Sequence, residues 1–388
     1  MTRQFQPPRF KDITPETERL AKLDHFWISI DSSLRLWRFS YLWDEDPKGK
    51  HIPPAKSRFY EPVLLIHGIG KDHRIFNWLA RELWYFGFRL IFSIDFSNNL
   101  SFIENAEQLG KVIADIRKIT KAYRISMITN SSGGLSARFY SKFIAGADSN
   151  IRILAMIESP HHKANYLGTL ANIRNLEVSD SQINQQLDYL EDMNAETTEK
   201  ELYRLTLVNI GTLKYPGIRL RQAGTLARKF VPLSDAINIT VGLTHLRVLR
   251  HKTIFRLLRP FLIPEVAVFK IRLLTLTAYN KQIFLRIHFK NRVTQKYPQR
   301  GLIHFPSSKE AFIPQVPMVV FASYFPLDDP NPPRLSIYAF HRTKSLGMER
   351  IGKIEVVIAF EKLPSIEYHT LLGRDGERID FALYTYIP

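Results

Sequence analysis

Residues 125–138, Ile-Ser-Met-Ile-Thr-Asn-Ser-Ser-Gly-Gly-Leu-Ser-Ala-Arg, decide how the rest of the chain is interpreted. An apolar run ends at Ile128, Ser131 follows, and two glycines lead into a stretch with helical periodicity. This order predicts a strand, a sharp turn and a helix, with Ser131 at the tip of the turn. Such a turn needs small residues two positions before and two positions after the serine, and these are Thr129 and Gly133.

The same alternation of apolar strand, turn and helix extends to both sides of this segment. It is typical of a mostly parallel sheet that is covered by helices on both faces. The Ser131 turn then lies at the carboxyl ends of strands, where open α/β sheets place their functional sites. The predicted strands are 63–66, 90–94, 125–128, 153–157, 205–210 and 237–241, and the predicted helices include 77–86, 103–121 and 134–145.

The sequence divides into three regions. Residues 1–55 predict a polar extension and a hairpin with its turn at 31–33, and residues 56–265 predict the α/β domain. Short β-rich runs separated by proline and charged turns predict that residues 266–388 form a smaller all-β sandwich. Two domains also fit the length, since single cores stop growing at about 250–300 residues. The insertion 164–200 is a candidate lid.

The sequence is strongly basic. Lysine and arginine number 54 against 37 aspartate and glutamate residues, a formal net charge of +17, which favours anionic partners such as an anionic membrane surface. Residues 244–259 alternate aliphatic and cationic side chains, which fits a helix resting on anionic lipid or a core-packing helix with a basic outer face. We expect no nucleic-acid partner, because no recognition motif accompanies the charge.

Composition also bears on location. No stretch reaches the roughly 20 apolar residues that span a bilayer. The first residues lack the apolar core of a secretory signal and the chain has no cysteine. We therefore expect a cytoplasmic protein, with peripheral membrane attachment as an option, and no disulfides; the sequence does not indicate an oligomeric state.

A second motif, Leu64-Leu65-Ile66-His67-Gly68-Ile69-Gly70, runs from a predicted strand into a glycine turn. A backbone N–H in such a turn can be presented to a negative charge that develops on a substrate oxygen. The amide of Ile69 is the expected first donor, and the amide of Ser132 is the second. We expect His67, through its backbone, and Gly68 to support this oxyanion loop.

Residues from about 31 to 262 resemble the lipase branch of the α/β-hydrolase superfamily. The resemblance is carried by His67-Gly68, the Ser131 elbow with its Gly-Gly-Leu-x-Ala-Arg continuation, Ser159-Pro160-His161, and Gly242-Leu243-Thr244-His245-Leu246. It implies that Ser131 is the nucleophile, that His245 is the general base, and that the amides of Ile69 and Ser132 are the oxyanion donors. Two other interpretations stay open: an ordinary turn serine, and Ser132 as nucleophile in a shifted register.

The expected acid of the triad is missing from its usual place. No aspartate or glutamate occurs between Leu202 and Ser234, and Tyr215-Pro216-Gly217 stands where the family has an Asp-Gly pair. A carboxylate is needed to orient the histidine, and an amide substitute costs about 10⁴ in turnover in a serine protease. Glu158, which ends the strand after the nucleophile strand, is the favoured substitute, as in some family lipases. Asp235 is the alternative.

The C-terminal region has a weaker resemblance to C2-like membrane-binding sandwiches, carried by residues 334–340 and 350–354. Calcium sites of that family need several loop carboxylates, and only Asp328 and Asp329 are close together, so a calcium-independent domain is expected. A structural β-domain that shields the hydrolase or mediates self-association is equally allowed. We expect no metal site and no cofactor, because no His/Asp/Glu cluster has zinc spacing.

Two functions therefore remain open. The first is a serine hydrolase that cleaves carboxylic esters, above all lipid esters, at or near a membrane surface. The second is a catalytically silent relative that acts as a membrane-binding or partner-binding protein.

Overall fold

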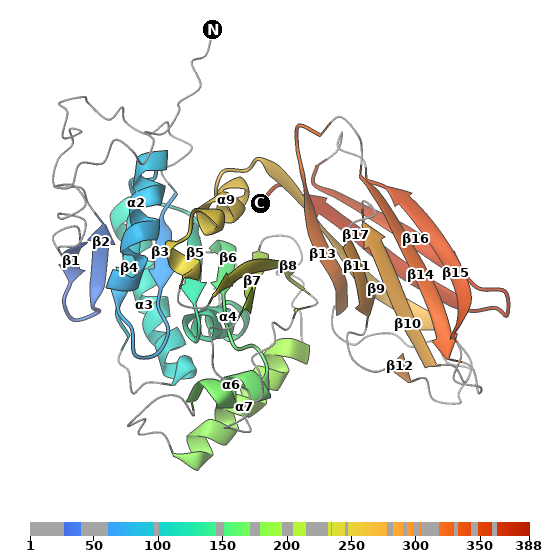
Figure 1. Cartoon of the computed structure of the whole chain (residues 1–388), viewed down its shortest axis with the longest axis horizontal. Coiled ribbons are helices and arrows are strands. Elements are labelled where there is room, and N and C mark those ends of the chain that lie inside the picture. Colours follow the sequence, from blue (N-terminus) through green and yellow to red (C-terminus); the bar gives the residue numbers. More distant parts are fainter. Residues whose placement is uncertain are drawn as a thin grey trace, which may run out of the picture. The chain divides into compact units, whose positions relative to one another are not determined.

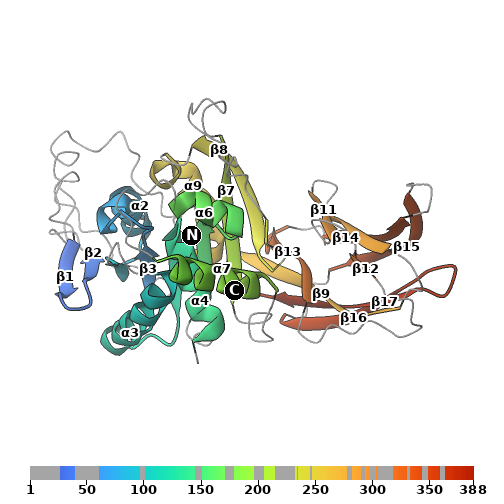
Figure 2. The same ribbon diagram turned by 90° about the horizontal axis from the view of Figure 1, so that it is seen from below.

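The computed structural model describes residues 27–39, 61–96, 101–144, 151–170, 179–195, 205–214, 232–233, 235–244, 247–277, 282–289, 293–297, 303–304, 318–329, 333–342, 348–358 and 363–388. They form two compact units, shown in Figures 1 and 2 and described here one at a time. Unit 1 comprises Met1–Met193, Leu207–Val231 and Ile239–Ile263; unit 2 comprises Asn194–Thr206, Pro232–Asn238 and Pro264–Pro388.

An eight-stranded sheet has the order β1-β2-β4-β3-β5-β6-β7-β8. Neighbours among β3, β4, β5 and β6 pair in parallel, whereas β1 and β2 are antiparallel additions at one edge. This is the α/β-hydrolase fold, as predicted, and the central strands are buried along their whole length. The strands are β1 Trp27–Asp31, β2 Leu36–Phe39, β3 Val63–Ile66, β4 Ile91–Ile94, β5 Ile125–Asn130, β6 Ile151–Ile157, β7 Thr206–Lys214 and β8 Ile237–Thr244.

Helices cover this sheet (Figure 1). They are α2 Asn77–Phe86, preceded by the 3-10 helix η4 His73–Phe76, α3 Phe102–Thr120, α4 Gly133–Phe143, α6 Lys163–Leu170, α7 Asp180–Ala195 and α9 Lys252–Leu262, preceded by the 3-10 helix η5 Val248–Arg250. The start of α3 is fixed by a capping box, in which the Ser101 hydroxyl accepts from the Glu104 N–H and the Glu104 carboxylate accepts from the Ser101 N–H.

The predicted lid region contains α6 and α7, and α7 is docked on the helices beside it. The Met193 carbonyl accepts hydrogen bonds from Arg138 and Lys142 of α4, each of 2.7 Å. The Tyr189 ring packs edge-on against Phe139 at 5.1 Å between centroids. The described part of the insertion is therefore packed structure, and opening as a lid stays a prediction. Residues 171–178 and 196–200 lie outside the described residues.

The basic segment after β8 forms a helix whose apolar side packs into the core, the second of the two alternatives predicted for residues 244–259. In α9, Ile254, Leu258 and Phe261 are buried. The Arg152 guanidinium, on β6, donates to the Phe261 and Leu262 carbonyls, each at 2.9 Å, so the end of α9 is tied to the sheet. The apolar side of the helix is thus occupied by protein. Exposed cations remain on the outer side of η5 and α9, namely Arg247, Arg250, Lys252 and Arg256.

Unit 2 contains an all-β sandwich, as predicted. One sheet has the order β13-β9-β17-β16, and the other has the order β11-β10-β14-β15 with β12 paired to β10. Phe269, Phe321 and Leu285 belong to the apolar core of the sandwich. The strands are β9 Val266–Thr277, β10 Gln282–Phe289, β11 Val293–Tyr297, β12 Ile303–His304, β13 Met318–Pro326, β14 Arg334–Arg342, β15 Met348–Val357, β16 Ser365–Leu372 and β17 Arg378–Tyr386.

Candidate active site

Ser131 lies at the tip of the turn between β5 and α4. Its φ of 53° is in the left-handed region, which costs a residue with a side chain about 1–3 kcal/mol. The turn is held by hydrogen bonds on both sides: the Ser131 N–H donates to the Ile157 carbonyl at 2.9 Å, and the Ser131 carbonyl accepts from Gly134 at 3.0 Å. The surrounding structure therefore keeps Ser131 in a strained conformation, which is the geometry of a nucleophile elbow.

The residues around the serine leave no room for larger side chains. A Cβ on Gly133 would lie 2.4 Å from the His67 carbonyl oxygen, and one on Gly134 would lie 2.0 Å from the Ser159 hydroxyl. Thr129 occupies the position of the usual first glycine. It is fully buried, and its hydroxyl donates to the Ala155 carbonyl at 3.2 Å, which explains how a threonine is accommodated there.

The oxyanion loop after β3 lies directly against the elbow. A Cβ on Gly68 would lie 2.7 Å from the Ser131 Cβ and 3.2 Å from its Oγ. Glycine is therefore required at position 68 for the loop to approach the serine. The two motifs are 63 residues apart when measured from Ile69 to Ser132, and the fold brings them into contact.

The two expected oxyanion donors are neighbours, and one of them is already engaged. The Ile69 N–H donates to the Ser132 hydroxyl at 2.9 Å. Ser132 is buried, with 4% of its surface exposed, whereas Ser131 is half-buried and has the left-handed backbone. This arrangement favours Ser131 over Ser132 as the residue that reaches a substrate.

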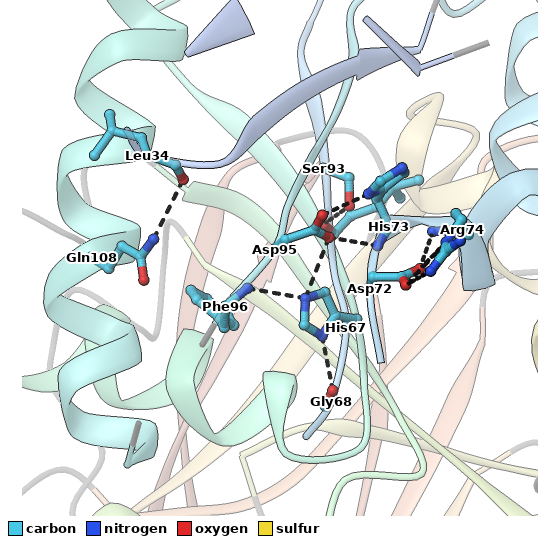
Figure 3. A network of polar contacts seen from close by, with 11 residues as sticks. Leu34, His67, Gly68, Asp72, His73, Arg74, Ser93, Asp95, Phe96 and Gln108 are labelled. Atoms are coloured by element: carbon cyan, nitrogen blue, oxygen red, sulfur yellow. Dashed lines mark hydrogen bonds and ion pairs between the residues drawn. The ribbon is translucent and has the colours of Figure 1, made fainter. Parts of the chain in front are cut away.

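A polar network that the sequence interpretation missed fixes the oxyanion loop (Figure 3). His67 Nδ1 donates to the Gly68 carbonyl at 2.8 Å, while its Nε2 accepts from the Phe96 N–H at 3.0 Å. These bonds select the neutral ring with its proton on Nδ1, and burial lowers the pKa of His67, which keeps the ring neutral. His67 thus supports the loop through its side chain, whereas the sequence predicted a role for its backbone.

Asp95 anchors the same loop from the end of β4. Its carboxylate accepts from the His73 N–H at 2.6 Å and contacts the His73 ring at 2.7 Å, and it lies 3.6 Å from Nε2 of His67 (Figure 3). The sequence signal for Asp95 was its place directly after a buried strand, at the end where sites form. Asp95 and His73 position the loop.

Glu158 directly follows β6, and its neighbour Ile157 is hydrogen-bonded to the elbow. The φ of Glu158 is 57°, and Ile157, which precedes it, accepts the N–H of Ser131. The Glu158 N–H donates to the Ile210 carbonyl at 2.8 Å, and its carboxylate accepts from the Thr212 N–H of β7. The carboxylate therefore lies at the junction of β6 and β7, hydrogen-bonded to the backbone of β7.

The predicted base, His245, lies outside the described residues, and so do Tyr215 and Gly217. Strand β8 ends at Thr244, immediately before His245. Asp235, which is buried, lies before the other end of β8. Eight extended residues span about 26 Å, so Asp235 lies far from the carboxyl end of that strand. This separation favours Glu158 over Asp235 as the acid that would orient His245.

His161 is fully buried, and burial together with the nearby positive charge of Arg138 holds its pKa well below 6.5. A neutral histidine inside unit 1 fits a packing role. Across the described ranges, no group of three or more His, Asp or Glu side chains is arranged to hold a metal ion.

The fold and the elbow define a class, proteins with an α/β-hydrolase core and an attached β-sandwich. No protein-family model and no curated protein sequence matches the chain. Among solved structures, it is similar to the Bacillus licheniformis lipase BlEst2 in mature form, with 15% identity, 59% of this chain and 98% of that chain covered, and a TM-score of 0.46.

The propeptide form of BlEst2 matches at 11% identity over 87% of this chain and 98% of that chain, with a TM-score of 0.46. A C2 domain of plant Extended Synaptotagmin 1 matches at 11% identity over 32% of this chain and 97% of that chain, with a TM-score of 0.24.

Proposed function

We propose that the protein is a serine hydrolase that cleaves carboxylic esters. The observation that carries the proposal is the strained Ser131, held at a positive φ with Gly68 of the oxyanion loop against its side chain. Backbone strain of this kind persists where the structure over-determines it, and it is concentrated at functional sites. An ordinary turn serine would not require glycine at both Gly68 and Gly133, where the oxyanion loop and the elbow are in contact.

In the proposed mechanism, the Ser131 hydroxyl attacks the ester carbonyl while His245 takes its proton. His245 then gives the proton to the leaving alcohol, Glu158 orients His245, and water clears the acyl-enzyme. The Ile69 N–H exchanges its Ser132 acceptor for the oxyanion. The exchange is favourable because a hydrogen bond to a charged acceptor is about twice as strong as a neutral one.

Lipid esters are the proposed substrates, met by a cytoplasmic protein at an anionic membrane surface. The support is electrostatic: the four exposed cations of η5 and α9 follow β8 and the predicted base in the chain, and the 247–262 segment has no acidic residue. Because the apolar side of α9 is buried, attachment there would be electrostatic, without insertion of the helix into lipid. No helix among the described residues has the length and apolarity to cross a membrane.

A fluorophosphonate probe tests the enzyme directly. We expect it to label the wild-type protein and the Ser132→Ala variant and to leave Ser131→Ala unlabelled. Labelling that survives Ser131→Ala and disappears in Ser132→Ala would establish the shifted register. An unlabelled but folded wild-type protein would refute the hydrolase and leave the catalytically silent relative.

The acid is tested with a soluble p-nitrophenyl ester. Glu158→Gln should lower turnover by up to about 10⁴, the effect of an amide substitute at the triad acid, while Asp235→Asn should leave the catalytic step close to wild type. The reverse order of the two effects would transfer the role to Asp235.

Membrane attachment is tested separately by vesicle sedimentation. Reversing the charges of Arg247, Arg250, Lys252 and Arg256 should abolish binding to vesicles that contain phosphatidylglycerol, with hydrolysis of the soluble ester retained. Equal binding of the wild-type protein and the charge-reversed variant to anionic vesicles would exclude this surface as the membrane-attachment site.

A further inference from the structure

Strand β16 ends one of the two sheets of the sandwich (Figure 1). It pairs with β17 at eight consecutive positions, from Ser365 opposite Thr385 to Leu372 opposite Arg378. Among the described strands, none pairs with its other edge, although β15 lies close to the end of β16, where a Cβ on Gly352 would be 2.9 Å from the Leu372 carbonyl oxygen. An edge strand presents a row of backbone N–H and C=O groups that can pair with another chain.

This edge lacks most of the features that commonly prevent such pairing. Soluble proteins protect long edge strands with lysine, proline, a bulge or short length. The sequence of β16, Ser-Ile-Glu-Tyr-His-Thr-Leu-Leu, contains no lysine, arginine or proline, and its register with β17 is unbroken. Its outward face is apolar, with Ile366 43% exposed, Tyr368 72% exposed and Leu372 69% exposed.

The other face of β16 carries a carboxylate and an imidazole, which can hydrogen-bond to each other. Glu367 and His369 are two positions apart, so their side chains share one face, and they lie 3.4 Å apart. In an antiparallel pair of two β16 strands with the two-fold axis at Tyr368, each residue before the tyrosine opposes the residue equally far after it. Glu367 then faces His369 of the partner subunit.

We propose that β16 pairs with β16 of a second copy of this chain, antiparallel and centred on Tyr368. The two tyrosine rings meet at the axis, where aromatic cross-strand pairs contribute to sheet stability. Ile366 then opposes Thr370 of the partner subunit on the same face. The four-stranded sheets of the two copies become one continuous sheet across the dimer.

The absence of native cysteine allows a sharp test of this register. Opposite residues of an antiparallel pair have Cα atoms about 4.5–5.5 Å apart, within the range that a disulfide bridges. Tyr368→Cys should therefore form a disulfide-linked dimer under mild oxidation. Ile366→Cys and Thr370→Cys should each stay monomeric on a non-reducing gel, because each is about 13 Å from its own counterpart. Mixed together, these two variants should cross-link to each other.

Light scattering coupled to size-exclusion chromatography provides the second measurement. The wild-type chain should run as a dimer that dissociates on dilution. Tyr368→Lys, which places two positive charges at the axis, should be monomeric with an unchanged circular dichroism spectrum. A wild-type monomer at every concentration overturns the proposal, and so does equal cross-linking of all three single-cysteine variants. Neither result depends on whether Ser131 is a nucleophile.

Discussion

Gly133→Ala should destabilise unit 1, because the new methyl group meets backbone that cannot move independently. Its Cβ would lie 2.4 Å from the His67 carbonyl oxygen and 2.8 Å from the Ile66 carbonyl oxygen, well inside van der Waals contact. Overpacking a core costs about 1–3 kcal/mol, and alanine regains at most about 1 kcal/mol of helix propensity at the start of α4. We expect a net loss of about 1–2 kcal/mol in the free energy of unfolding.

The five tryptophans make the measurement specific. All lie between residues 27 and 84, inside unit 1, so their fluorescence during urea unfolding reports that unit alone. The matched control is Gly110→Ala, whose Cβ would meet only the Tyr140 ring, at 3.2 Å, and should change stability by less than about 1 kcal/mol. Equal stabilities of Gly133→Ala and the wild type would show that the loop after β3 is not packed against the elbow as described.

Three further predictions concern buried and half-buried polar groups in unit 1. Arg152→Met should cost about 3 kcal/mol, because the half-buried Glu61 carboxylate, now 2.5 Å from the guanidinium, loses its partner and the Phe261 and Leu262 carbonyls lose their donor; the double variant with Glu61→Gln should recover part of the loss in the same urea assay. His161 is neutral when folded and binds a proton when unfolded below about pH 6.5, so stability should fall as the pH drops below that value, and His161→Gln should flatten this slope. Asp95→Ala should cost about 1–3 kcal/mol by leaving the His73 N–H without its acceptor and should lower kcat for a p-nitrophenyl ester; unchanged kcat would exclude the positioning role.

Local sequence signals predicted the elements of the α/β core well. The predicted helix 77–86 coincides with α2, and the predicted strand 63–66 coincides with β3. These elements are short and are either uniformly apolar or strongly periodic, and Gly87 marks the end of α2. Adjacent parallel strands need a crossover connection, usually a helix, between them. The order of strands and helices in the sequence therefore already limited the possible sheet topologies.

Contacts between distant residues could not be predicted in this way. Arg152 reaches Phe261 across 109 residues, and that bond is part of what made α9 a core helix. The periodicity of residues 244–259 was the same for both alternatives, because it records which side is apolar and says nothing about what covers that side. The Asp95 network was likewise missed, since its partners are joined only by folding.

Leu205 and Thr206 are hydrogen-bonded to residues of unit 2 that are synthesised much later, so these contacts form late during synthesis of the chain. Lys270 donates to the Leu205 carbonyl at 2.8 Å, and the Thr206 hydroxyl is hydrogen-bonded to the Tyr386 hydroxyl at 3.2 Å, 180 residues further along. A ribosome adds about 5–20 residues per second, so Thr206 waits roughly 10–40 seconds for that partner during synthesis. Leu205 and Thr206, which are buried in the folded chain, therefore cannot complete these contacts until the last strand, β17, has been synthesised.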